Sequence, residues 1–179
     1  MSDERKGHWM YTCSGVVYYP EDPRPAEINI EDIAHHLSML CRFSGAVSRY
    51  YSVAEHSYHV SHMVPPELAL EALLHDATEA YLGDLIRPVK ASCPDYKNLE
   101  EINDAAVRIR FKLSPYEHPL VKKADNDILC NEYRELLPPM PTHVPWTWPG
   151  EYRPEVKICG WNPGLAKVEF LMRYQELMR

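Results

Sequence analysis

Three histidines at residues 56–62 and a group of carboxylates further along the chain could bind a metal ion or move protons. His56, His59 and His62 fall on one predicted helix, but only His56 shares a face with the apolar positions Val53 and Val60. A buried histidine needs a partner for each ring nitrogen, either a hydrogen bond or a metal ion. His56 is therefore a candidate ligand, although a hydrogen-bonded core histidine explains the same pattern.

A second group of such residues lies inside the apolar run 72–83. Glu79 follows His75 by four positions and Asp76 by three, so a helix places the three side chains on one face. Burying two acids and a histidine costs several kcal/mol unless something compensates, and a divalent cation would do so. The alternative is a hydrogen-bonded cluster at a helix junction, because a His-Asp dipeptide alone is a weak signal.

One more carboxylate, Asp125, shares a predicted helical face with Val121 and Ile128 and is expected to point inward. The neighbouring Asp127 faces elsewhere and is expected to be solvated. Two imidazoles and two carboxylates bind one borderline divalent ion with room for water, such as Co, Mn, Zn or Fe, with Mg also possible. Such an ion lowers the pKa of its water. The candidate ligands are His56, His75, Asp76 and Asp125.

Helices must position these residues, and their expected boundaries follow from capping signals. Asn29 predicts the N-cap of a helix over 29–41. Ser52-Val53-Ala54-Glu55 is a capping-box sequence that begins a second helix. That helix ends at Pro65-Pro66, where a third begins and runs to Leu82, with Gly83 as its C′ residue. A fourth begins near Asp95 and a fifth covers about 118–137.

The two ends of the chain differ from this helical middle. Two short apolar and aromatic segments flank Ser14-Gly15 and predict an N-terminal hairpin. Prolines exclude a regular helix over 138–162, which also carries Trp146, Trp148 and Trp161. About 25 residues without regular structure are too many for a simple connector, so we expect an ordered flank or a partner surface.

These elements predict a mainly α chain that forms one domain over residues 1–179. We expect a helical core at about 26–137, a small N-terminal β-hairpin, a Pro/Trp-rich flank at 138–162 and a C-terminal helix over 163–179.

Composition narrows the possible partners and the compartment. A net charge of −7 disfavours a nucleic-acid polymer as partner, since phosphate contacts need a surplus of Lys and Arg. No apolar run reaches the length of a membrane span, and the polar start lacks the apolar core of a signal peptide. Five widely spaced cysteines do not predict a disulfide framework or a zinc finger. We therefore expect a cytoplasmic protein without a membrane partner.

The sequence motifs around the candidate ligands, taken in their order along the chain, resemble those of the HD-domain metal-dependent phosphohydrolases. The resemblance is closest to the bacterial and prophage 5′-deoxynucleotidases. The resemblance covers roughly residues 9–137 and implies a single HD-domain helical bundle. Residues 138–162 match nothing in that family. The motifs are Cys41-Arg42-Phe43-Ser44-Gly45, Tyr51-Ser52-Val53-Ala54-Glu55-His56-Ser57, Leu74-His75-Asp76-Ala77-Thr78-Glu79-Ala80-Tyr81, Gly83-Asp84-Leu85, Arg87-Pro88-Val89-Lys90 and Val121-Lys122-Lys123-Ala124-Asp125.

The resemblance also implies a role for each matching residue. The four candidate ligands would hold the metal ion, and Asp76 and Glu79 would be the catalytic residues, with Glu79 as general acid for the leaving ribose oxygen. Arg42 matches the phosphate-binding arginine, because a guanidinium fork suits a phosphate dianion. Asp84 matches the residue near the sugar 3′-hydroxyl, where a 2′-hydroxyl would be crowded. The substrate-binding set is Arg42, Phe43, Asp84, Lys90 and Lys122.

The resemblance implies a 5′-deoxynucleotidase that releases phosphate from deoxyribonucleoside 5′-monophosphates. His75 follows His56 by only 19 positions, which leaves the shape of the pocket open. The alternative is a triphosphohydrolase that converts a deoxynucleoside triphosphate to nucleoside and triphosphate, with Arg87, Lys90 and Lys123 near the extra phosphates.

A second alternative is a non-catalytic HD module that binds a nucleotide as a sensor. A third is an interaction protein that uses residues 138–161. We also expect a homo-oligomer, a dimer or larger, because members of the family form dimers or rings and exposed aromatic residues need cover.

Overall fold

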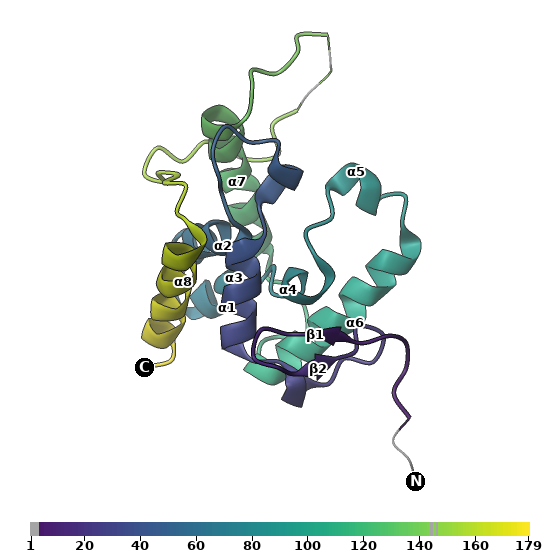
Figure 1. Ribbon diagram of the computed structural model, residues 1–179. Coiled ribbons are helices and arrows are strands. Elements are labelled where there is room, and N and C mark those ends of the chain that lie inside the picture. Colours follow the sequence, from purple (N-terminus) through teal and green to yellow (C-terminus); the bar gives the residue numbers. More distant parts are fainter. Residues whose placement is uncertain (1–3, 144, 146) are drawn as a thin grey trace.

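The computed structural model describes residues 4–143, 145 and 147–179, and it is mainly helical with one small antiparallel hairpin (Figure 1). The fold class predicted from the sequence is thereby confirmed. Within the described ranges, every helix is too short or too polar to span a bilayer. The elements are β1 Met10–Tyr11, β2 Val17–Tyr18, η1 Pro25–Glu27, α1 Ile30–Met39, η2 Arg42–Gly45, α2 Val53–His62, η3 Pro66–Leu68, α3 Ala69–Leu73, α4 Glu79–Leu82, α5 Arg87–Lys90, α6 Pro94–Phe111, α7 Pro119–Leu136 and α8 Pro163–Leu177.

The two predicted helix starts are confirmed. The Asn29 side chain accepts a hydrogen bond from the Asp32 N–H and caps α1. The Ser52 hydroxyl accepts one from the Glu55 N–H and caps α2.

Glu55, the second residue of the expected capping box, binds backbone groups of the Pro/Trp-rich flank with its carboxylate. The buried Glu55 carboxylate accepts three backbone N–H groups of the flank, from Cys159 and Gly160 at 2.8 Å and from Trp161 at 2.7 Å. The start of α2 therefore anchors the end of the flank.

The third helix is not continuous from Pro66 to Leu82, which corrects the sequence prediction. Turns over 74–78 separate α3 from α4. The backbone bonds there span three residues, as between the Glu79 N–H and the Asp76 carbonyl at 3.0 Å, and these tighter turns depart from α-helical spacing. The break falls on the segment that carries His75 and Asp76. The helix ends as predicted before Gly83, whose φ of +81° suits glycine.

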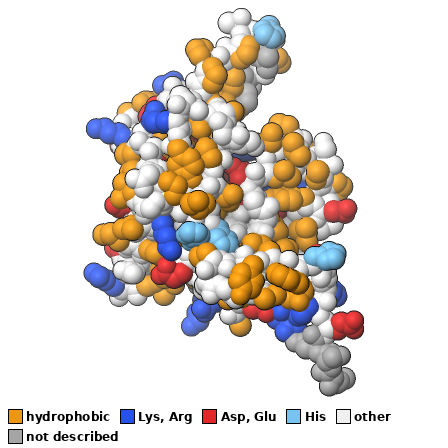
Figure 2. Space-filling view, viewed as in Figure 1, with side chains coloured by type: hydrophobic (Ala, Val, Ile, Leu, Met, Phe, Trp, Pro, Cys, Tyr) orange, Lys and Arg blue, Asp and Glu red, His pale blue; other side chains and the backbone are white. Residues whose placement is uncertain are grey.

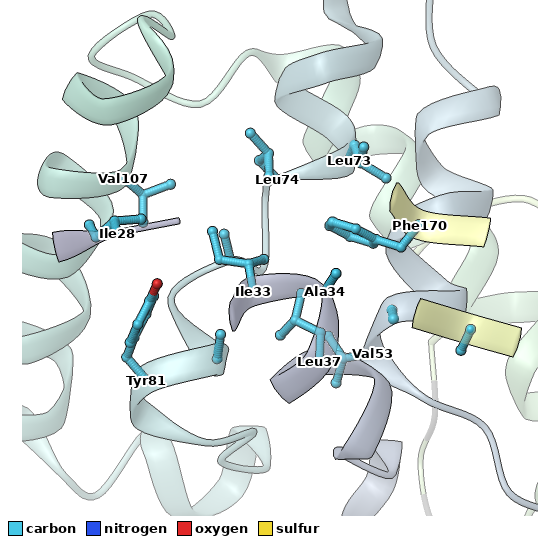
Figure 3. Close-up of a cluster of buried hydrophobic side chains, with 14 of the residues drawn as sticks. Ile28, Ile33, Ala34, Leu37, Val53, Leu73, Leu74, Tyr81, Val107 and Phe170 are labelled. Atoms are coloured by element: carbon cyan, nitrogen blue, oxygen red, sulfur yellow. The ribbon is translucent and has the colours of Figure 1, made fainter. Parts of the chain in front are cut away.

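Buried side chains from α1, α2, α3, α6 and α8 form the main core (Figure 3). Helix α1 lies at its centre and packs against both α2 and α8. Each fully buried aliphatic side chain contributes about 1.5–3 kcal/mol relative to an exposed one. The core therefore fixes α2 and α3, which carry or precede the candidate ligands. Its members include Ile28, Ile33, Ala34, Leu37, Val53, Leu73, Leu74, Val107 and Phe170.

The flank, residues 138–162, leaves the end of α7 at the top of Figure 1 and returns along α7 and α2 to α8. Val156 and Ile158 are buried. The Asn131 side-chain amide donates to the carbonyls of Arg153 and Val156, at 2.7 and 3.1 Å. The predicted flank aromatic Trp146 lies outside the described residues.

Asp127 is fully buried, which corrects the prediction that it is solvated. Its carboxylate accepts hydrogen bonds from Lys123 Nζ at 2.8 Å, from Arg153 Nε at 2.8 Å and from the Glu151 N–H at 2.9 Å. The reason is the flank, which covers the face of α7 that Asp127 occupies. The approach is so close that a Cβ on Gly150 would lie 2.6 Å from the backbone of α7.

Candidate metal centre and substrate cavity

Four side chains from three separate segments meet in the interior. His56 comes from α2, His75 and Asp76 from the turns over 74–78, and Asp125 from α7. The Nε2 atoms of the two histidines are 3.2 Å apart. Asp76 Oδ2 lies 3.5 Å from His56 Nε2 and 3.3 Å from His75 Nε2. Asp125 Oδ1 lies 3.4 and 3.9 Å from the same two nitrogens. His56, His75 and Asp125 form a group that could hold a metal ion.

Hydrogen bonds to Nδ1 of each histidine leave its other ring nitrogen, Nε2, pointing into the centre. His75 Nδ1 lies 2.8 Å from the Ala72 carbonyl, which can only accept, so Nδ1 carries the proton. His56 Nδ1 lies 2.6 Å from Glu132 Oε1, another acceptor. Each Nε2 is thereby left with a lone pair, and the two lone pairs face each other. Such an arrangement is stable only with a positive charge at the centre, as a proton or as a cation.

The pKa values of the histidine and carboxylate groups in the centre are set by burial and by their charged neighbours. Burial lowers the pKa of His56, but the carboxylates of Glu132 and Asp125 raise it to about 9. Burial raises the pKa of Asp125, yet the neighbouring His56 and His75 hold that pKa well below its usual range. The pKa of Asp76 is likewise lowered by the histidines and Arg42 against the effect of burial. The site therefore favours anionic carboxylates around a positive charge.

Glu132 joins the centre to Arg42 and is a site residue that the sequence reasoning missed. It is fully buried and binds His56 through one oxygen and Arg42 Nη2 through the other, at 3.0 Å. A carboxylate on the far nitrogen of a metal-binding histidine orients the ring and raises its basicity. The missed signal was its spacing: Glu132 follows Asp125 by seven residues, on the same face of α7.

The centre borders a cavity of about 550 Å³ between α5 on one side and α7 and η2 on the other. The view in Figure 2 shows acidic side chains in the hollow between the two halves of the molecule. Asp76 and Asp125 line this cavity, while the side chains of the two histidines are at most 3% exposed and lie outside its lining. All five predicted substrate-binding residues line it as well, together with Glu79: Arg42, Phe43, Asp84, Lys90 and Lys122.

Arg42 and Phe43 reach the cavity from the η2 turn. Phe43 and Ser44 have φ of +55° and +51°, a left-handed conformation that costs non-glycine residues about 1 kcal/mol or more each. The ring of Phe43 packs edge-on against Tyr133 of α7, with 5.6 Å between ring centroids, and Tyr133 also lines the cavity. The two rings form an aromatic wall beside the Arg42 guanidinium. Tyr133 was not identified from the sequence.

Glu79 is buried at the edge of this cavity, and its Oε2 has no hydrogen-bond partner among the described residues. Burial, together with the charges of Asp76 and Asp84, raises the pKa of Glu79 well above its usual range. This shift favours the protonated form of Glu79, which can donate its proton to a bound molecule.

Of the four basic residues besides Arg42 that are expected near the substrate phosphates, three line the cavity and one does not. Lys90 and Lys122 line the cavity but already bind carboxylates, Glu100 at 2.6 Å and Asp125 at 2.8 Å. Arg87 is exposed at the cavity rim. Lys123 lies outside the cavity and binds Asp127 instead, so its expected place near a substrate phosphate is not what the structure shows.

Comparison with other proteins places the chain in a family. It is 46% identical over 125 residues to the uncharacterized protein YfdR of Escherichia coli K12, with 70% of each chain covered. This chain belongs to the YfdR family. A second relative, the uncharacterized protein RCAP_rcc00048 of Rhodobacter capsulatus, is 40% identical over 129 residues, with 66% of each chain covered. No family model matches the sequence. The names of these two relatives state no activity, so function has to be argued from the site.

Proposed function

We propose that the protein is an HD-type metal-dependent phosphohydrolase that releases phosphate from deoxyribonucleoside 5′-monophosphates. One observation supports this proposal above the others. A cluster of metal-binding side chains, a buried arginine and a carboxylic acid with a raised pKa border the same cavity. Phosphate-ester hydrolysis needs these three components: a cation, a binding site for phosphate oxygens and a proton for the leaving group.

The donor set fits one divalent ion, because the inward lone pairs of His56 and His75 and the carboxylates of Asp76 and Asp125 converge on one place. The nitrogen and oxygen donors suit Mn, Co, Zn or Fe. When bound, such an ion supplies an activated water and offsets phosphate charge.

Charge in the cavity favours a phosphate once a divalent cation is present. The described lining contains four acids and four bases, so the fixed charges balance. Protonation of Glu79 and a divalent ion both shift the balance to positive. This local balance allows a protein with a net charge of −7 to bind a dianion. The acids are Asp76, Glu79, Asp84 and Asp125, and the bases are Arg42, Arg87, Lys90 and Lys122.

Five of the residues that line the cavity then have a role in substrate binding or catalysis. Arg42, held by Glu132, donates to the phosphate oxygens through its guanidinium group. Glu79 protonates the 5′-oxygen as the bond to phosphorus breaks, and a deoxynucleoside leaves. Asp84 accepts a hydrogen bond from the sugar 3′-hydroxyl, and the aromatic wall of Phe43 and Tyr133 contacts the base.

A monophosphate fits this cavity better than a triphosphate. Two of its bases, Lys90 and Lys122, are already paired with carboxylates, and Lys123 lies outside the cavity. Arg87 at the rim, whose Nη2 lies 3.8 Å from Asp125 Oδ2, is the most exposed base of the lining for a β- or γ-phosphate.

Product analysis tests the proposal. Metal-stripped protein is reloaded with Mn, Co, Zn, Fe or Mg and incubated with each deoxynucleoside mono- and triphosphate. We expect inorganic phosphate from monophosphates, and a folded Asp76→Ala variant without that activity. Release of triphosphate would establish the triphosphohydrolase alternative, and nucleotide binding without any product would establish the sensor alternative. Wild-type turnover in Asp76→Ala would contradict the assigned centre.

A further inference from the structure

A second group of metal-binding side chains lies where the N-terminal hairpin meets α1, outside the cavity described above. Cys13 is in the hairpin turn, and Asp32 and His36 are on α1. Cys13 Sγ lies 3.1 Å from Asp32 Oδ1, and one donor atom from each residue lies within 4.8 Å of the other two. We propose that Cys13, Asp32 and His36 bind a zinc ion that ties the hairpin to α1.

His36 is oriented as a ligand by a partner on its other nitrogen. Its Nδ1 lies 2.6 Å from the carbonyl oxygen of Ala80, which can only accept a hydrogen bond. Nδ1 therefore carries the proton, and the Nε2 lone pair accepts a hydrogen bond from the Cys13 backbone N–H at 3.2 Å, which a zinc ion would replace. A backbone carbonyl on the far nitrogen is the usual partner of a zinc-binding histidine.

Asp32 is held in place by donors other than the thiol. It is fully buried, and it accepts hydrogen bonds from the Ser14 N–H at 2.8 Å, the Ser14 hydroxyl at 2.7 Å and Asn29 Nδ2 at 2.7 Å. Oδ1 also faces the Cys13 thiol. When zinc binds, the S–H bond breaks and its proton passes to solvent, while a Zn–S bond forms. The Oδ1 lone pair that faced the thiol is then available to the metal.

The donor types and spacing favour zinc. Zn–S bonds of about 2.3 Å and Zn–N or Zn–O bonds of about 2.0–2.1 Å place tetrahedral ligands about 3.3–3.6 Å apart. The three donor atoms approach these separations, so shifts of about 1 Å close the site. A thiolate with an imidazole favours zinc over Mg or Mn. Cys13 is exposed, beside a surface hollow of about 460 Å³ lined by the hairpin, α1 and the residues of α4 from Glu79 to Tyr81, and water would complete the fourth position.

Cobalt(II) substitution tests the site without any assumption about catalysis. A thiolate bound to Co²⁺ gives a near-ultraviolet charge-transfer band, whereas a centre of His56, His75, Asp76 and Asp125 has only nitrogen and oxygen donors and gives none. We expect the band when Co²⁺ is added to the wild-type protein, and its loss when Zn²⁺ displaces the cobalt. Cys13→Ser should abolish the band. Cys159→Ser, which removes another exposed thiol, should retain it.

Alkylation provides a second readout that does not depend on a variant. Zn²⁺ should protect Cys13 from iodoacetamide and leave Cys159 reactive, as measured by peptide mass spectrometry. Absence of the band at saturating Co²⁺, the same band in folded Cys13→Ser, or equal alkylation of Cys13 with and without Zn²⁺ would overturn the proposal.

Discussion

Asp125 and Asp127 lie two residues apart on α7, and both are buried, yet their surroundings differ. Asp127 is satisfied by the protein itself, through Lys123, Arg153 and the Glu151 N–H. Asp125 faces the Nε2 atoms of two histidines, the half-exposed Lys122 and, at 3.8 Å, the exposed guanidinium of Arg87. The first carboxylate has the partners of a structural group, and the second has the partners of a metal ligand.

The same difference separates the two regions to which these carboxylates belong. On the flank side, Glu55 and Asn131 are matched by backbone groups of residues 153–161. On the cavity side, the histidine lone pairs face each other and Glu79 Oε2 lacks a partner within the described chain. An unsatisfied buried polar group costs about 1–3 kcal/mol. Folding removes this cost for Glu55, Asn131 and Asp127 on the flank side, whereas at Glu79 on the cavity side it is left for a bound ion or substrate to remove.

Substitution of Asp125 should have the largest effect. Asp125→Asn removes an anionic ligand, and we expect phosphate release from dAMP to fall about 1,000-fold or more, since metal stabilisation of the transition state contributes several kcal/mol. Steady-state kinetics of the manganese-loaded protein measure this loss.

Asp127→Asn is the matched control for that variant. It weakens the bonds to Arg153 and Lys123, so the free energy of unfolding in urea should fall by about 2–3 kcal/mol. Activity per folded molecule should stay at the wild-type level. Equal losses of activity in the two variants would break the distinction between the two carboxylates.

Replacing the proton donor should give the next largest effect. Glu79→Gln should lower turnover of dAMP about 100- to 1,000-fold. Turnover of p-nitrophenyl phosphate should be nearly unchanged, because nitrophenolate leaves without a proton. Since the pKa of Glu79 is raised, its acid form persists to higher pH than in an ordinary glutamate and is lost as the pH rises through that pKa. The wild-type rate on dAMP should therefore fall on the alkaline side. A similar alkaline fall in Glu79→Gln would rule out this role.

Glu132→Gln should have an intermediate effect that reports on the orientation of His56. Glutamine still accepts the Nδ1–H of His56 but lacks the negative charge that polarises the ring and pairs with Arg42. We expect the affinity for Mn²⁺ to fall about 10- to 100-fold, measured by calorimetry. An unchanged dissociation constant would show that Glu132 serves only the fold.

The smallest effect is expected at Tyr133, where the two regions meet, because its ring packs against Phe43 on one side and Trp148 of the flank on the other. Tyr133→Ala should reduce kcat/KM for dAMP about 5- to 10-fold, as expected for about 1 kcal/mol of base stacking. It should not affect deoxyribose 5-phosphate, which has no base, and Tyr133→Phe should behave as the wild type. Equal losses on both substrates would assign Tyr133 to packing alone.

Local signals predicted much of this structure because they depend on neighbours in sequence. The caps at Asn29 and Ser52 need only residues three positions away. The inward positions of His56 and Asp125 follow from helical spacing within their own helices. The convergence of these two residues with His75 and Asp76 needs the packing of three segments, which residue types and the family resemblance indicated but local spacing could not.

The errors arose where distant segments decide the outcome. Helical spacing places Asp127 away from the core face of α7, but the flank, more than 20 residues later, covers that side. Periodicity also favoured an unbroken helix through His75, because the apolar pattern continues across the turns over 74–78. Glu55 matched a capping box, and only the folded flank shows that its carboxylate binds backbone groups of residues 159–161.

Calorimetric titration with Mn²⁺ tests the central claim most directly, because manganese prefers nitrogen and oxygen ligands over a thiolate. The wild-type protein and Asp127→Asn should each bind one ion per chain with the same affinity, and folded Asp125→Asn should bind none. Failure of the wild type to bind Mn²⁺, or wild-type binding by Asp125→Asn, would contradict the account.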